Sequence, residues 1–272
     1  MSDSFPQAKD MADESMVRNL AAQAEALWPQ EEPVFARNGL PQGAKALDVG
    51  CGTGEITYRV ARLFPTAQLI GVDIDESHLG RARTLCAPLG DRVRFEPADA
   101  YSLPYPDGHL DLVVCRHVLQ AVSDAPRAVR EMLRVLKPGG RLHVIAEDYG
   151  MLWSTPLPKD SEYFWREGAL AYGKSVGCDL HIGRKMFTLF TDLGMTSITA
   201  DYLVADTIRV NRETFARIWE AWRDGYTDSL VQHSKLPRAE IDRLWAEMIG
   251  SARDPRGYAL WQVPVWSALK GG

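Results

Sequence analysis

Between residues 45 and 147 the chain alternates short apolar runs with amphipathic stretches. The apolar runs, each short enough for a buried strand, are 46–49, 68–73, 93–95, 110–115 and 141–147. The run at 110–115 is almost wholly apolar, as is typical of a strand covered on both faces. Helical spacing follows the first, second and fourth runs, and the helix at 125–136 ends before Lys137-Pro138-Gly139-Gly140, a helix stop signal. This alternation predicts an open parallel sheet wrapped by helices.

The pattern changes after residue 148. Residues 149–182 are rich in aromatic residues and glycine and have no clear period. A helix is predicted at 183–193, and strand-like stretches at 197–208 and 257–269 could pair at the edge of the sheet. Between these stretches two amphipathic helices are predicted, one behind an Asn211 cap and one after Pro237.

These patterns predict an α/β fold: a Rossmann-like, doubly wound, seven-stranded and mostly parallel sheet with a helical lid formed by insertions. The predicted segments are an N-terminal helical lid segment (1–43), the Rossmann-like core (44–148), an aromatic lid insertion (149–182), a continuation of the core (183–210), a helical lid insertion (211–256) and a final edge strand of the core (257–272). All eight tryptophans lie outside 45–148. They indicate either a lid packed with large rings or a pocket for a flat, apolar small molecule.

Composition narrows the classes of partner. The 272 residues carry a formal charge of -5 with a pI near 5.7, and a protein that binds nucleic acid through phosphates would normally be basic. No apolar run approaches the roughly 20 residues that cross a bilayer, and the polar N-terminus lacks the features of a secretion signal, so we expect a cytoplasmic protein without a membrane partner. The four cysteines are scattered, which predicts neither a disulfide nor a metal site.

The glycine-rich loop at 50–54 carries the strongest chemical signal. A strand that ends in closely spaced glycines and continues into a helix brings bare backbone close to a ligand. The spacing is G-x-G-x-G, and Glu55 follows directly. A carboxylate at that position would repel a pyrophosphate, so the loop favours a ligand with a cationic centre over a dinucleotide such as NAD. Asp73, at the end of the second strand, could accept hydrogen bonds from a ribose.

Four motifs together resemble the class I S-adenosylmethionine-dependent methyltransferases, and in particular the small-molecule enzymes of the ubiquinone/menaquinone type. The motifs are LDVGCGTGEIT (47–57), GVDIDESHLGRAR (71–83), ADAYSLPYPDGHLDLVVCRHVLQ (98–120) and EMLRVLKPGGRL (131–142). They occur in the right order over 45–148, which is far more specific than a lone glycine loop. The resemblance implies S-adenosylmethionine as cofactor and S-adenosylhomocysteine as product.

The resemblance also implies roles for individual residues. Those implied to surround the methionine part of the cofactor are Asp48, Gly50, Cys51, Gly52 and Gly54. Asp73 would hold the ribose, with Ile74 against the adenine face. Asp99 would accept from the adenine amino group beside the Ala100 backbone, and Arg116 would offer its backbone to the methionine end or act as a surface or lid-pairing residue.

Candidates for proton transfer follow the fourth and fifth strands, because open α/β sheets bind ligands at the carboxyl ends of their strands. His117 is suited to act as a base for a hydroxyl, phenol or amine, although a histidine that merely packs on the next helix has the same pattern. Glu147 could orient an amine or accept a proton. His181 is a weaker third candidate at a predicted helix start.

The expected function is therefore methyl transfer to a small, aromatic or partly apolar metabolite, in a setting such as natural-product biosynthesis, with the O, N or C acceptor atom left open. Two alternatives remain: a protein or RNA methyltransferase, and a non-catalytic protein that binds S-adenosylmethionine or S-adenosylhomocysteine. A homodimer is a further expectation, since exposed helices rich in tryptophan often find partners.

Overall fold

The computed structural model describes residues 5–7, 14–157 and 161–272 and shows an α/β fold around one mixed sheet. The strands are β1 (Lys45–Val49), β2 (Gln68–Asp73), β3 (Val93–Pro97), β4 (Leu110–Arg116), β5 (Leu136–Ile145), β6 (Leu152–Thr155), β7 (Thr196–Asp206) and β8 (Tyr258–Leu269). Their order is β3-β2-β1-β4-β5-β8-β6, and β7 pairs with β8 outside this path. The first five strands are parallel, whereas β8 is antiparallel to each of its partners.

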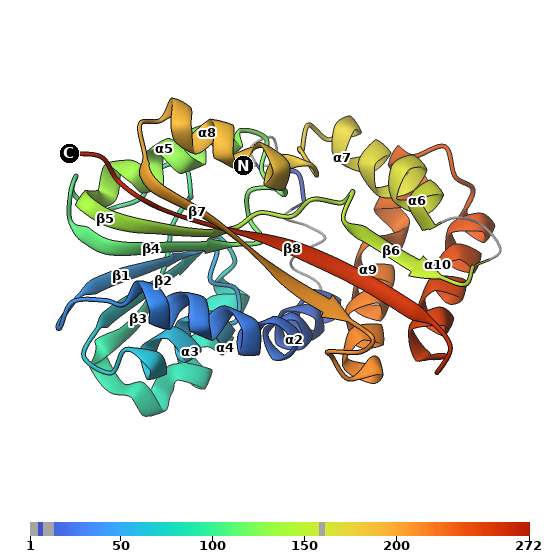
Figure 1. Ribbon diagram of the computed structural model, residues 1–272, viewed down its shortest axis with the longest axis horizontal. Helices are drawn as coiled ribbons and strands as arrows, with labels where there is room; N and C mark the ends of the chain where they lie inside the picture. The colour runs from blue at the N-terminus through green and yellow to red at the C-terminus, as the bar shows by residue number, and fades with distance from the viewer. Residues whose placement is uncertain (1–4, 8–13, 158–160) are drawn as a thin grey trace.

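Helices connect the strands and form a separate group at one end of the molecule (Figure 1). The α-helices are α2 (Glu14–Asn38), α3 (Glu55–Leu63), α4 (Glu76–Cys86), α5 (Ala125–Val135), α6 (Ser161–Phe164), α7 (Ala171–Ser175), α8 (Met186–Asp192), α9 (Arg212–His233) and α10 (Arg238–Arg253). The shorter turns are η1 (Ala87–Arg92), the π-helical η2 (Trp165–Leu170) and η3 (Ile182–Lys185). The predicted Asn211 cap is present, because its side chain accepts from the Glu213 N–H.

The sheet has eight strands instead of the predicted seven, and its last strand does not lie at an edge. β8 is twelve residues long, so its start pairs with β6 and its end with β5. β7 pairs along the other side of β8 and occupies the edge. Figure 1 shows these two long strands leaving the core and reaching the group formed by α6, α7, α9 and α10. The strand β6 was not predicted because four residues inside an aperiodic segment give no pattern of their own.

The boundary between α5 and β5 also differs from the prediction. The sequence predicts that the helix stops before Lys137-Pro138-Gly139-Gly140 and that the next strand starts at residue 141. In the structure β5 already begins at Leu136 and includes these four residues. A register shift between Leu110 and Leu112 of β4 accommodates them. At its other end β5 stops at Ile145, so Glu147 lies in the loop beyond the strand.

The N-terminal segment is more than a lid. Helix α2 contains Pro29 and Pro33, and its second half packs against the sheet, where Phe35 stacks on His143 at 4.1 Å between ring centroids. Its first half brings Met16 and Leu20 to the edge of the sheet that holds the glycine loop. One helix therefore connects the sheet core to the site described below.

The apolar interior consists of a mainly aliphatic part and a part that is rich in aromatic side chains. Aliphatic side chains dominate the core around β1, β4 and β5, as the sequence predicted from the absence of tryptophan there. The second core, which lies between the sheet extension and the outer helices, is aromatic, and its buried tryptophans are Trp165, Trp219, Trp222, Trp245 and Trp261. All four cysteines are buried and free.

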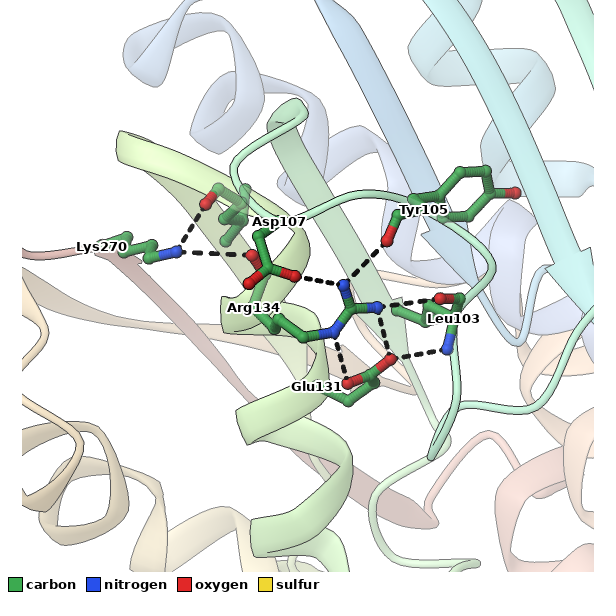
Figure 2. Close-up of polar contacts among 7 residues, drawn as sticks. Leu103, Tyr105, Asp107, Glu131, Arg134 and Lys270 are labelled. Carbon is green, nitrogen blue, oxygen red and sulfur yellow. Dashed lines mark hydrogen bonds and ion pairs between the residues drawn. The ribbon is translucent and has the colours of Figure 1, made fainter.

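One arginine holds the loop before β4 against α5 (Figure 2). The Arg134 guanidinium donates to the Leu103 and Tyr105 carbonyls at 2.9 and 2.8 Å, and it pairs with Glu131 and Asp107. Lys270 donates to the Leu136 carbonyl at 2.7 Å and thereby joins the end of the chain to the same corner. These bonds stabilise the loop that leads from β3 to β4.

Candidate active site

The glycine-rich loop begins where β1 ends and turns back over β2. The Gly50 and Cys51 N–H groups both donate to the Val72 carbonyl, at 2.8 and 3.0 Å. Gly50 has a φ of +70°, and a Cβ placed on it would lie 2.3 Å from Val118. Glycine is therefore required here both by the left-handed backbone and by the close approach of the neighbouring turn.

The parallel strands β1 to β5 end at one edge of the sheet, and residues at and after the carboxyl ends of β1 to β4 line a pocket, which we call the glycine-loop pocket. Six of the predicted cofactor residues line it: Gly50, Gly52, Asp73, Ile74, Ala100 and Arg116. Asp73 accepts from the Gly52 N–H at 2.8 Å and from the Asp75 N–H at 3.0 Å, so its carboxylate is fixed in place. Ile74 is 48% exposed and offers an apolar surface beside it.

Four other predicted cofactor residues do not line the pocket. Asp48 is buried beneath the loop and Cys51 is also buried, while Gly54 caps α3 with a φ of +81°. Asp99 lies between the lining residues Ala98 and Ala100, and its carboxylate accepts from the Tyr101 N–H at 2.7 Å. These four residues lie within or beneath the loops that carry the lining residues, and they fix the conformation of those loops.

Burial raises the pKa of Asp48 to about 6, although the Thr57 hydroxyl donates to its carboxylate at 2.6 Å. The folded protein therefore keeps this proton to higher pH than the unfolded chain does. Between about pH 4 and about pH 6 the folded state binds more protons, so rising pH destabilises it by up to about 3 kcal/mol.

An Asp48→Asn variant removes this titration. Its free energy of unfolding relative to the natural protein is expected to increase by up to about 3 kcal/mol as the pH rises through that window, then to level off. Urea unfolding of both proteins at several pH values measures the difference. Curves that stay parallel would contradict a buried, titrating Asp48.

The two residues predicted for proton transfer are brought together. His117 follows β4 and Glu147 follows β5, and His117 Nδ1 lies 2.8 Å from Glu147 Oε1. Gln120 Nε2 donates to the same oxygen at 3.1 Å. His117 has a φ of +56°, which is unusual for a residue with a side chain, and its N–H donates to the Ile145 carbonyl. Both side chains are buried, and within the described part of the chain no hydrogen bond satisfies His117 Nε2 or Glu147 Oε2.

Arg116 takes part in a second buried cluster. Its guanidinium lies 2.9 Å from Glu31 of α2, and Glu31 also contacts His143 Nε2 at 3.0 Å. Burial raises the pKa of the Glu31 carboxyl, but Arg116 and His143 outweigh it and the pKa is lowered. The cluster ties α2 to two strands of the sheet and neutralises the Arg116 charge.

Two smaller hollows of about 20 Å³ each share lining residues with the glycine-loop pocket, whose volume is about 110 Å³. The first, which we call the central chamber, is lined by His117, Gln120 and Glu147 together with Asn19, Tyr149 and Trp222. The second, the aromatic chamber, is lined by Phe164, Trp165, Tyr172, Trp222, Tyr226 and Trp245. His117 lines both the glycine-loop pocket and the central chamber, while Tyr149 and Trp222 line both chambers. The glycine-loop pocket therefore shares lining residues with the central chamber, and the central chamber shares lining residues with the aromatic chamber.

Sequence reasoning missed several lining residues. Leu20 and Gln7 lie far before the motif region, and no periodic pattern shows which face of α2 meets the site. Gln120 is the last residue of the motif at 98–120, but its contact with Glu147 depends on the tertiary fold. His181 lies directly before η3, near the predicted helix start, and its Nε2 is 4.0 Å from Asp148.

The core segment matches a known family. Residues 47–144 match the family model described as a methyltransferase domain. This segment is a class I methyltransferase domain. Among curated proteins, the ubiquinone/menaquinone biosynthesis C-methyltransferases UbiE of Pseudomonas entomophila and Pseudomonas putida are each 43% identical over 111 residues. The aligned part is 40% of this chain, and the chain spans 43% of the length of those relatives.

Solved structures resemble the methyltransferase domain together with its appended segments. The [4+2]-cyclase SpnF has a TM-score of 0.62 at 25% identity and covers 98% of this chain and 97% of its own. A phosphoethanolamine N-methyltransferase 2 of Haemonchus contortus, in complex with S-adenosylhomocysteine, has a TM-score of 0.61 at 20% identity over 97% of this chain and 60% of its own. The geranyl diphosphate C-methyltransferase of Streptomyces coelicolor A3(2) has a TM-score of 0.55 at 19% identity over 98% and 84%.

Among the described residues, none of the helices combines the length and the apolar composition needed to cross a membrane.

Proposed function

We propose that this protein is an S-adenosylmethionine-dependent methyltransferase that acts on a small, aromatic or partly apolar metabolite. One observation carries the proposal: His117 lies at the junction of the glycine-loop pocket and the central chamber, with Glu147 behind it. A donor in the first hollow and an acceptor in the second would meet beside an imidazole.

The residues of the glycine-loop pocket fit an adenosyl sulfonium. Asp73 offers a fixed carboxylate for ribose hydroxyls, Ile74 offers an apolar face for adenine, and the glycines allow close approach of the backbone. Arg116 is the only lysine or arginine among the described lining residues, and Glu31 neutralises it, so no free cationic side chain of this lining favours a pyrophosphate. When bound, S-adenosylmethionine supplies an electrophilic methyl group.

The chain itself contributes orientation and a base. Glu147 accepts the His117 Nδ1–H and so leaves Nε2 as the atom that takes a proton from the acceptor. Holding two reactants in line can contribute on the order of 7–11 kcal/mol. The burial of both side chains excludes water from the place of transfer.

The chambers support a metabolite over a macromolecule as acceptor. Tryptophan, tyrosine and phenylalanine rings surround the aromatic chamber, and Tyr149 stacks with Trp222 at 6.1 Å where the two chambers meet. Rings of this kind bury flat, apolar ligands. A ring-bearing metabolite, as made in natural-product biosynthesis, suits this lining.

A second candidate function has a specific observation in its favour. The [4+2]-cyclase structure covers almost the whole of this chain and of its own, including the segments that form the chambers. A protein that binds the donor but closes a ring on a bound substrate would use the same hollows without methyl transfer.

Calorimetric titration tests the first step of the proposal. Heat is expected with S-adenosylmethionine and with S-adenosylhomocysteine, and none with NAD or NADP. Release of S-adenosylhomocysteine in the presence of a panel of hydroxyl, amine and carbon acceptors then tests transfer. Tight binding of a nicotinamide dinucleotide without binding of the sulfonium would overturn the proposal, whereas donor binding without turnover across the panel would favour the cyclase.

A further inference from the structure

The central chamber presents hydrogen-bond acceptors that one carboxylate has oriented. Glu147 Oε1 accepts from His117 Nδ1 at 2.8 Å and from Gln120 Nε2 at 3.1 Å. Each donor then turns its other polar atom away from this oxygen, so Gln120 Oε1 is left as an acceptor, and so is His117 Nε2 when the ring is neutral. Glu147 Oε2 is a third acceptor. These three atoms, and Asn19 Oδ1 in the same chamber, are buried without a hydrogen bond among the described residues, and all four residues line the chamber.

Buried polar atoms are normally satisfied, so this group of four unpaired acceptors indicates a ligand. The ligand must bring N–H or O–H donors, because a ligand that offered only acceptor atoms could not form hydrogen bonds with these protein acceptors. A hydroxyl brings one donor, whereas a primary ammonium brings three on one atom. An ammonium can therefore satisfy more of these unpaired acceptors than a hydroxyl can.

The charge of the chamber points the same way. Glu147 is 3% exposed, and among the described residues no lysine or arginine lines this chamber. The nearby Arg116 already pairs with Glu31. A buried carboxylate without a cation is costly, and a bound ammonium would compensate it. Tyr149, Trp222 and Tyr226 add aromatic rings, which attract cations as well as apolar groups.

We propose that the acceptor is a primary amine on an apolar frame, and that Glu147, Gln120 and His117 hold its ammonium group in the central chamber. This inference rests on the proposed function and names its substrate class. The family match ends at residue 144, before Glu147 and the rings of both chambers, so it does not define the acceptor.

The chemistry balances with the groups at hand. The ammonium first gives one proton to His117 Nε2, which frees the nitrogen lone pair. That lone pair attacks the methyl carbon of the sulfonium, a C–N bond forms, and the C–S bond breaks with its electron pair going to sulfur. The products are a methylated ammonium, the neutral thioether S-adenosylhomocysteine and a protonated His117, which returns its proton to solvent.

Matched ligand pairs test the proposal. We would titrate the full chain with 2-phenylethylamine against 2-phenylethanol, and with tryptamine against tryptophol, using calorimetry with and without S-adenosylhomocysteine. Hydrogen bonds to a charged group contribute about 1.5–3 kcal/mol, so each amine is expected to bind at least about tenfold more tightly than its alcohol. Glu147→Gln should abolish this preference, whereas Glu32→Gln, an exposed carboxylate of α2, should keep it.

A second variant keeps the test decisive if Glu147→Gln does not fold. Gln120→Leu retains the carboxylate and removes one acceptor, so it should weaken amine binding by about 2–10-fold while alcohol binding changes little. Equal binding of amine and alcohol, tighter binding of the alcohols, or no binding of either amine would overturn the inference. Failure of S-adenosylhomocysteine to bind would instead overturn the proposed function, since the amine preference is also measured without it.

Discussion

The His117→Ala variant is expected to lose about 10²–10⁴-fold in kcat, the usual contribution of a general base, with S-adenosylhomocysteine affinity nearly unchanged. His117 contacts Glu147 through Nδ1 and leaves Nε2 for the acceptor, so removing the ring removes the proton route. The backbone should tolerate the change less well than usual, because a φ of +56° is also unfavourable for alanine. The measurement is release of S-adenosylhomocysteine with the acceptor that gives the highest rate in the natural protein.

Two comparisons separate chemistry from folding in this experiment. His117→Asn removes the base but tolerates the left-handed backbone better, so it should show the same loss in kcat. His109→Ala changes a histidine before β4, beside Lys45, and should keep full activity. Turnover that survives in both His117 variants would remove this residue from the mechanism.

The second large effect concerns stability. Glu31→Gln is expected to lower the free energy of unfolding by about 3–5 kcal/mol, because it leaves the buried Arg116 charge uncompensated. Glu31 is fully buried, and its two oxygens contact Arg116 and His143 at 2.9 and 3.0 Å. Urea unfolding of the protein without ligand gives the value directly.

A matched control variant and a double variant test whether the unpaired Arg116 charge causes this loss of stability. Glu32→Gln, on the exposed side of the same helix, should change stability by no more than about 0.5 kcal/mol. The double variant Glu31→Leu/Arg116→Met removes both charges, so it should recover most of the loss. A double variant as unstable as Glu31→Gln would show that packing, and not the unpaired charge, causes the effect.

The pH dependence follows from the same cluster. The pKa of Glu31 is lowered in the folded protein, so its charged form stabilises the fold above the pKa of the unfolded chain. This contribution is lost as the pH falls through the folded pKa. The difference in stability between the natural protein and Glu31→Gln should therefore shrink in acid.

The sequence determined the parallel core and the location of its site. Short apolar runs and helical spacing are local properties, so they predicted β1 to β4 and α5 with boundaries close to those observed, and the starts of α9 and α10. The carboxyl ends of parallel strands must meet at one edge, and this topology alone predicted that His117 and Glu147 lie in the same region. The sequence motifs did not predict the direct contact between His117 and Glu147.

Only the tertiary structure decided the rest. The long β8 is placed inside the sheet by partners that lie more than fifty residues away from it, and no local pattern encodes that pairing. The contacts of Glu31 with Arg116, and of Gln120 with Glu147, join segments whose spacing in the chain carries no period. Local periodicity fixes which residues form an element, whereas long-range burial and charge compensation fix which elements meet. For this reason the motifs indicated the glycine-loop pocket, while the two chambers became visible only in the folded chain.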